Sequence, residues 1–123
     1  MATIGILVPP WSGHLNPMNT LGRELALRGH RVVVPLFPDG EAPVRAAGLE
    51  FVSIGADRYP PGTMKRVDAA LGALSGRAAL KYTIEALAGM SLTFMRDSPA
   101  VFRAAGAEVI LVDQALPVGG TVP

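Results

Sequence analysis

Two residues of this 123-residue chain, His14 and Asp113, could act together in proton transfer. Each follows a short apolar segment, His14 after residues 4–8 and Asp113 after residues 108–112. A carboxylate that holds one ring nitrogen of a histidine orients the imidazole and stabilises the cation formed when the other nitrogen takes a proton. The pair could therefore be a general base and its supporting carboxylate. Spacing alone equally allows two turn residues that bond to the backbone.

The element that positions His14 is a βα unit at the start of the chain. Residues 4–8 predict a strand and residues 9–14 a turn. Asn16 followed by Pro17 predicts a helix start, since Asn is a favoured N-cap and Pro fits the first helical position. His14 then lies just before the helix, at the end of the strand where open α/β sheets bind ligands. The apolar face of this helix is predicted from the spacing of Met18, Leu21, Gly22, Leu25 and Ala26.

The rest of the chain alternates strands and helices. Strands are predicted at residues 31–37, 49–54 and 108–112, and helices at 41–47, 63–76, 77–96 and 98–105. Ser98 and Pro99 predict the cap and first position of the last helix. Strands joined by helices pair in parallel, so we expect a Rossmann-like α/β sheet of order 3-2-1-4 with helices on both faces. This order brings His14 and Asp113 to neighbouring strand ends.

Composition excludes several classes of function. The net charge of +1, with both signs interspersed, gives no reason to expect nucleic acid or another anionic surface as partner. The lack of cysteine excludes disulfides, thiolate metal sites and cysteine nucleophiles. No apolar run approaches the roughly 20 residues of a transmembrane helix, and the N-terminus lacks the basic segment of a secretion signal. We expect a cytoplasmic protein.

Several short motifs carry a family resemblance. The run GHLNPM at residues 13–18, followed by LGREL at 21–25 and RGHRV at 28–32, resembles the start of the GT-B nucleotide-sugar glycosyltransferases. VDQ at residues 112–114 and GGT at 119–121 are also similar to that family, especially to its bacterial zeaxanthin- and macrolide-glucosyltransferase-like members. The resemblance covers the whole chain, although its specific motifs lie at the two ends.

The resemblance implies a definite reaction. His14 would deprotonate an acceptor hydroxyl with support from Asp113, and the hydroxyl would displace UDP from the anomeric carbon of a UDP-sugar. The step inverts configuration and needs no metal and no cofactor beyond the UDP-sugar co-substrate. The acceptor would be an apolar small molecule such as a terpenoid, carotenoid or polyketide. Its candidate binding residues are Trp11, Gly13, Met90 and Phe94, although apolar packing would explain the aromatic residues and Met90 at least as well.

Members of the family are much longer than this chain. We therefore expect residues 1–123 to be an incomplete N-terminal acceptor-binding domain that lacks the C-terminal donor-binding domain and is inactive alone. Two alternatives remain. The chain could be a non-catalytic α/β binding or interaction module. Less favoured is a dinucleotide-binding Rossmann domain, in which Asp39 would bind a ribose, because residues 9–14 lack the required glycine pattern.

Overall fold

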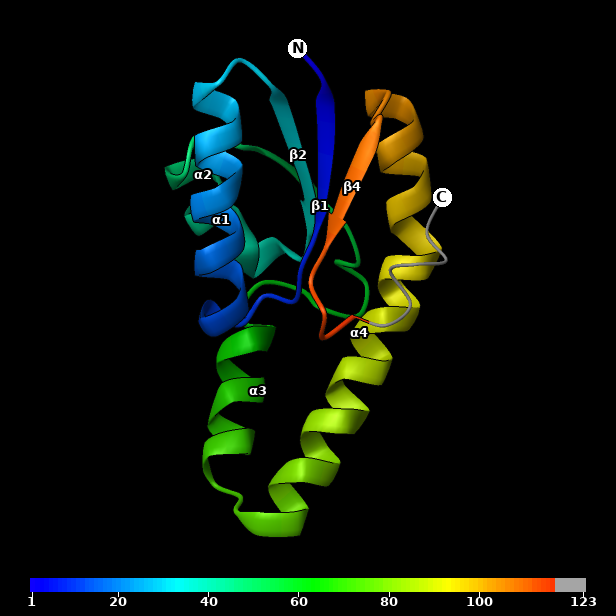
Figure 1. Cartoon of the computed structure of the whole chain (residues 1–123). Helices are drawn as coiled ribbons and strands as arrows, with labels where there is room; N and C mark the ends of the chain where they lie inside the picture. Colours follow the sequence, from blue (N-terminus) through cyan, green and yellow to red (C-terminus); the bar gives the residue numbers. More distant parts are fainter. Residues whose placement is uncertain (117–123) are drawn as a thin grey trace.

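A four-stranded parallel sheet forms the centre of the molecule, and helices cover both of its faces (Figure 1). The computed structural model describes residues 1–116, so the GGT motif at residues 119–121 lies outside the described residues. The strand order is β3-β2-β1-β4, which confirms the predicted order and fold class. The strands are β1 (Thr3–Leu7), β2 (Arg31–Leu36), β3 (Glu50–Ser53) and β4 (Val109–Val112).

The two central strands are buried along almost their whole length. Ile6 and Leu7 of β1 and Val34 and Leu36 of β2 are fully buried. Strands covered by helices on both faces are expected to be continuously apolar, which is why these two segments were recognisable in the sequence. The edge strands β3 and β4 are shorter and more exposed.

One face of the sheet is covered by α1 (Ser12–Leu27) and α2 (Glu41–Ala46), the latter preceded by the 3-10 helix η1 (Pro38–Gly40). Gly22 allows the close approach of α1, since a Cβ there would lie 2.7 Å from Leu49 Cδ1 and 3.0 Å from Ile6 Cδ1. The predicted apolar face is wrong at Leu21, which is 45% exposed. Asn19 is buried instead of Leu21. The face of α1 that contacts the sheet is therefore rotated toward Asn19.

The predicted start of the first helix at Asn16 is also wrong. The helix α1 begins at Ser12 and contains Pro17 in its interior. Its first turn is closed by the backbone N–H groups of His14 and Leu15, which both donate to the Trp11 carbonyl, at 3.0 and 2.8 Å. Burial of the Leu15 side chain in the core favours this earlier start. This burial offsets the loss of one helical hydrogen bond, because Pro17 has no backbone N–H to donate.

The opposite face of the sheet is covered by α4 (Gly76–Ala105), one continuous helix of 30 residues. The predicted break at Ser98 and Pro99 is wrong. Phe94, Ser98 and Phe102 recur every four residues and are all buried, so an unbroken helix presents a single stripe to the sheet. Gly5 of β1 makes room for this stripe, since a Cβ there would lie 2.5 Å from Phe102 Cε1.

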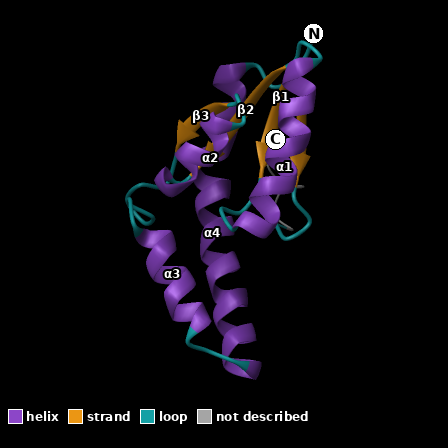
Figure 2. Cartoon of the chain, turned by 90° about the vertical axis from the view of Figure 1, so that its left-hand side faces the viewer, coloured by secondary structure: helices purple, strands orange, loops and turns teal. Residues whose placement is uncertain are grey.

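The helix α3 (Thr63–Gly72) and the N-terminal half of α4 form a hairpin that projects beyond the carboxyl end of the sheet (Figures 1 and 2). The N-cap of α3, Gly62, has a φ of 90° and no side chain with which to cap the helix. Asp39 does so instead, because its two carboxylate oxygens accept the N–H groups of Gly62 at 2.8 Å and Met64 at 2.9 Å. Among the described residues, no helix is long and apolar enough to cross a membrane.

Candidate active site

The ends of the two neighbouring strands β1 and β4 bring His14 and Asp113 together. Leu7 and Val112, the last residues of these strands, are paired in the sheet. Asp113 directly follows Val112, and its backbone N–H donates to the Leu7 carbonyl at 2.9 Å. His14 is the third residue of α1, so the turn between β1 and the helix returns it to the same edge.

The imidazole and the carboxylate are in direct contact. The Nδ1 atom of His14 lies 3.1 Å from Oδ1 and 3.2 Å from Oδ2 of Asp113. An ionised carboxylate can only accept, so the hydrogen of this contact is assigned to Nδ1, and in the neutral ring Nε2 then keeps its lone pair. The side chain of His14 is 39% exposed and that of Asp113 is 11% exposed. The arrangement thus holds an accessible imidazole in the tautomer that a general base requires.

The local backbone fixes the position of the Asp113 carboxylate. Its Oδ1 atom accepts the backbone N–H of Ala115 at 2.8 Å, and the Leu116 N–H donates to the Asp113 carbonyl at 3.0 Å. Asp113 is therefore both a turn residue and the partner of His14. The turn interpretation of Asp113 is thus confirmed, and its catalytic role beside His14 stays a prediction.

Trp11 lies at the N-cap of α1 and links this helix to the hairpin. Its Nε1–H donates to Asp68 Oδ1 on α3 at 2.9 Å, and its ring packs against the core. Gly13 is exposed, and a Cβ there would meet no atom of residues 1–116 within 4 Å. Open space therefore adjoins the backbone beside His14.

Phe94 and Met90 occupy the core and are fully buried. The Phe94 ring stacks on Phe37 at a centroid distance of 5.0 Å, and Phe37 stacks on Tyr59 at 4.1 Å. The packing interpretation of both residues is therefore correct. Direct contact of Phe94 with an acceptor does not fit this arrangement.

Met90 nevertheless forms the floor of a hollow between α3 and α4, which we call the hairpin hollow. It measures about 260 Å³ and includes both tyrosines of the chain. Burial raises the pKa of the Tyr59 hydroxyl. These tyrosines were not predicted as site residues, although two isolated tyrosines in a chain with few aromatic residues were a usable signal. The lining residues are Tyr59, Val67, Tyr82, Glu85, Ala86 and Met90.

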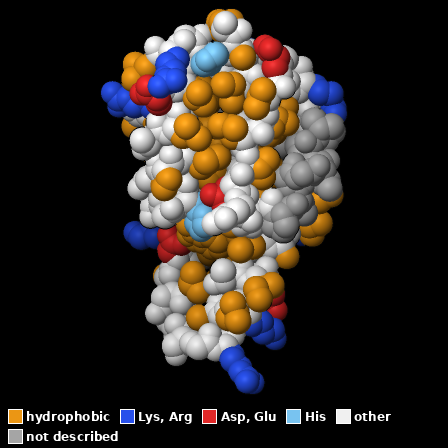
Figure 3. Space-filling view, in the orientation of Figure 1, with side chains coloured by type: hydrophobic (Ala, Val, Ile, Leu, Met, Phe, Trp, Pro, Cys, Tyr) orange, Lys and Arg blue, Asp and Glu red, His pale blue; other side chains and the backbone are white. Residues whose placement is uncertain are grey.

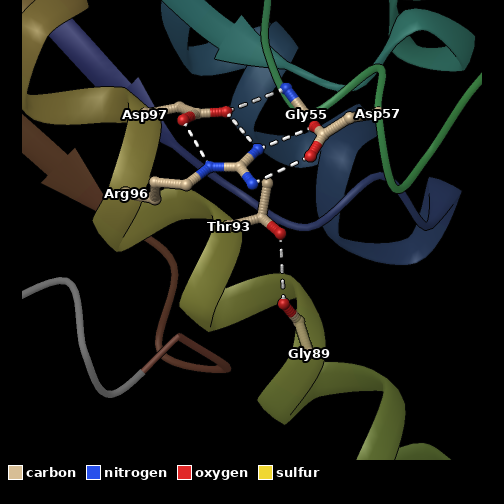
Figure 4. A network of polar contacts seen from close by, with 6 residues as sticks. All are labelled: Gly55, Asp57, Gly89, Thr93, Arg96 and Asp97. Atoms are coloured by element: carbon tan, nitrogen blue, oxygen red, sulfur yellow. Dashed lines mark hydrogen bonds and ion pairs between the residues drawn. The ribbon is translucent and has the colours of Figure 1, made fainter.

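A network around Arg96 holds the β3–α3 loop, which carries Tyr59, against α4 (Figure 4). The guanidinium donates to both carboxylate oxygens of Asp57, at 2.9 and 2.7 Å, and to both of Asp97, at 2.7 and 2.9 Å. Asp97 also accepts the backbone N–H of Gly55 at 3.1 Å. The hydrogen bonds from Arg96 lower the pKa of Asp57 and of Asp97, and those from Asp97 and Asp57 raise the pKa of Arg96.

The two other residues considered in the sequence have structural roles. Both carboxylate oxygens of Asp39 are used to cap α3, which removes the basis for a ribose-binding role. His30 Nδ1 accepts the backbone N–H of Ala2 at 3.0 Å. Within residues 1–116, no three His, Cys, Asp or Glu side chains gather into a set that could hold a metal ion.

Comparison with known proteins identifies glycosyltransferases as similar in sequence and in fold. No protein-family model matches the chain. The chain is 30% identical over 122 residues to zeaxanthin glucosyltransferase of Pantoea ananas, covering 99% of this chain and 28% of that enzyme. The chain thus spans less than a third of the length of this curated relative.

Solved glycosyltransferase structures have the same fold over this span. SsfS6, a glycosyltransferase of Streptomyces sp. SF2575, superposes with a TM-score of 0.75 at 19% identity, over 99% of this chain and 36% of that chain. The spinosyn rhamnosyltransferase SpnG, solved with thymidine diphosphate, gives a TM-score of 0.65 at 26% identity, over 97% of this chain and 30% of that chain. The predicted resemblance to GT-B nucleotide-sugar glycosyltransferases is confirmed.

Proposed function

We propose that this chain supplies the general base and the acceptor-binding surface of an inverting glycosyltransferase. The observation that carries the proposal is the contact between His14 and Asp113 at the carboxyl ends of β1 and β4. It lies at the ligand-binding edge of an α/β sheet whose fold matches glycosyltransferases.

The reaction requires one proton transfer and one displacement. Nε2 of His14 takes the proton of the acceptor hydroxyl while the hydroxyl oxygen bonds to the anomeric carbon of the sugar. The bond from that carbon to the nucleoside diphosphate breaks, and the diphosphate leaves with its electron pair. Asp113 stabilises the imidazolium through Nδ1–H, so the positive charge forms beside a fixed carboxylate.

The proposed acceptor is an apolar small molecule that bears a hydroxyl group, such as a carotenoid, terpenoid or polyketide. Support comes from the name of the Pantoea ananas relative, which specifies zeaxanthin. The hairpin hollow offers a surface of suitable chemistry, with two tyrosines and apolar side chains. Trp11 connects the surroundings of His14 with the hairpin hollow. It lies three residues before His14, and its Nε1–H donates to Asp68, the sequence neighbour of Val67, which lines the hollow.

The proposed donor is a sugar activated by a nucleoside diphosphate, UDP in the first instance. SpnG, which shares this fold, was solved with thymidine diphosphate. We assign donor binding to a second domain, in keeping with the fraction of each glycosyltransferase that this chain spans. Residues 1–123 would then need that domain for transfer.

The first experiment is to read the coding DNA beyond Pro123. If the reading frame continues, the whole product is assayed for UDP-sugar transfer to hydroxylated carotenoids, with and without His14→Ala. We expect the substitution to abolish most transfer. His30→Ala is the matched control, because the His30 ring bonds to the backbone of Ala2 and lies outside the proposed site. Equal activity of the two variants would contradict the assignment of His14, and a stop codon after Pro123 would favour a non-catalytic module.

A further inference from the structure

The hairpin of α3 and α4 projects from the body of the molecule and ends in a surface of mixed apolar and basic character. Both views of the chain show this projection (Figures 1 and 2), and the space-filling view shows hydrophobic and basic side chains together on it (Figure 3). With a rise of 1.5 Å per residue, the 30 residues of α4 are about 45 Å long. Its N-terminal part extends past the sheet (Figures 1 and 2).

Large apolar side chains on the outer face of α4 are open to solvent. Leu80 is 61% exposed and Ile84 is 58% exposed. They are four positions apart, so they lie on one face of the helix. Together with Arg77, Lys81 and Glu85 they line one shallow depression. We call Arg77, Leu80, Lys81 and Ile84 the tip patch, and Glu85 borders it.

The charge of the hairpin differs from that of the rest of the chain. Residues 63–85 contain four basic side chains and two acidic ones, a net charge of +2, whereas the remainder has seven basic and eight acidic side chains, a net charge of −1. Lys81 lies 4.0 Å from Glu85, a distance at which an exposed pair is weak. The hairpin segment therefore carries a net positive charge that the overall charge of +1 does not reveal.

We propose that the tip patch docks on the surface of an anionic lipid membrane. A helix that combines exposed leucine and isoleucine with basic residues binds at the boundary between head groups and acyl chains. Leu80 and Ile84 would enter that boundary, while Arg77 and Lys81 would contact the anionic head groups. The inference rests on this surface alone and does not depend on the glycosyltransferase proposal.

The experiment measures co-sedimentation of the 123-residue chain with vesicles of phosphatidylcholine, with and without phosphatidylglycerol. We expect binding to the anionic vesicles, and weaker binding at high salt because salt screens exposed charges. Arg77→Gln combined with Lys81→Gln should lower the partition coefficient by about fivefold per charge removed. Leu80→Gln combined with Ile84→Gln should abolish binding. Both pairs are exposed, so the folded state should persist, as circular dichroism will verify.

The matched control is Leu27→Gln combined with Arg23→Gln on α1. Leu27 is 73% exposed, more than either apolar residue of the tip patch, and it lies at the far end of α1 from the hairpin (Figure 1). Equal loss of binding in the control and tip-patch variants would overturn the proposal, as would equal binding to neutral and anionic vesicles. Sedimentation velocity tests self-association. A dimer that Leu80→Gln and Ile84→Gln convert to monomer, without vesicle binding by the original chain, would also overturn it.

Discussion

Nδ1 of His14 lies 3.1 Å from Oδ1 of Asp113, although the two residues are 99 positions apart in the chain. The parallel pairing of β1 with β4 produces this contact, because it aligns Leu7 with Val112 and so brings the following residues to one edge. The proposed base and its carboxylate therefore depend on the topology of the sheet, and no local motif could join them.

Asp113→Asn tests the contribution of the carboxylate in the active whole enzyme. Asn keeps an oxygen that can accept from Ala115, but it does not carry the charge that stabilises imidazolium. We expect kcat to fall by less than the roughly 10²–10⁴-fold typical for removal of a general base. In a His14→Ala background the same substitution should have almost no further effect, because the two residues act as a unit. Independent, additive losses would contradict this coupling.

Arg96→Gln tests the network that holds the β3–α3 loop. Arg96 lowers the pKa of Asp57 and Asp97 below their ordinary value of 3.8, so their contribution to stability is complete above that pH. It is lost as the pH falls through the lower folded pKa values. We expect the original chain to exceed Arg96→Gln in urea midpoint at neutral pH, with the difference shrinking below pH 3.8. The difference should be small, since the side chains of Arg96 and Asp57 are 47% and 60% exposed.

The control for this experiment is Arg103→Gln, which removes another exposed arginine from α4. It should leave the pH dependence of the midpoint unchanged. A difference between the original chain and Arg96→Gln that stays constant through acid pH would show that the two carboxylates do not supply the effect.

Gly5→Ala and Gly13→Ala form a matched pair for the packing of the sheet. A Cβ on Gly5 would lie 2.5 Å from Cε1 of the buried Phe102 ring, so we expect a loss of about 1–3 kcal/mol in the free energy of unfolding. A Cβ on Gly13 would meet no atom within 4 Å in the part of the chain that the structure describes. In the helix α1 that substitution should be neutral or stabilise by up to about 1 kcal/mol. Denaturant titration of both variants measures the contrast, and equal effects would contradict the packing of α4 on β1.

Asp39→Ala tests the capping of α3 by a residue that is distant in sequence. We expect a loss of about 1 kcal/mol, as for other helix caps, and faster hydrogen exchange at the Met64 amide, whose N–H donates to Asp39. Asp39→Asn should retain part of the protection because one oxygen remains. Unchanged exchange at Met64 in both variants would show that the cap contributes nothing.

The sheet could be predicted from the sequence because the central strands are continuous apolar segments between recognisable helices. The contact between His14 and Asp113 followed from the strand order alone. The helix boundaries could not be predicted at Pro17 and Pro99, where a local rule for proline favours a helix start. At Pro17, burial of Leu15 favours a helix that begins before the proline. At Pro99, burial of Phe102 favours a helix that continues through the proline.

The hairpin hollow and the Arg96 network depend on contacts that have no signature in the sequence. Arg96 contacts Asp57 across 39 positions, because the loop after β3 folds back onto α4. In the sequence, two charged residues so far apart cannot be distinguished from ordinary solvent-exposed residues. Tyr59 and Tyr82 likewise line one hollow although 23 positions separate them, because the loop before α3 lies beside α4.

The position of β4 beside β1 also determines when the site can form during synthesis on the ribosome. Strands β1, β2 and β3 are neighbours in the sheet and all lie within the first 53 residues, so they can pair early. The fourth strand emerges only after the long helix α4, and loop closure over such a separation is slow. A nascent chain would therefore hold His14 without its carboxylate until the last strand is added. Completion of the sheet and assembly of the proposed base are a single event.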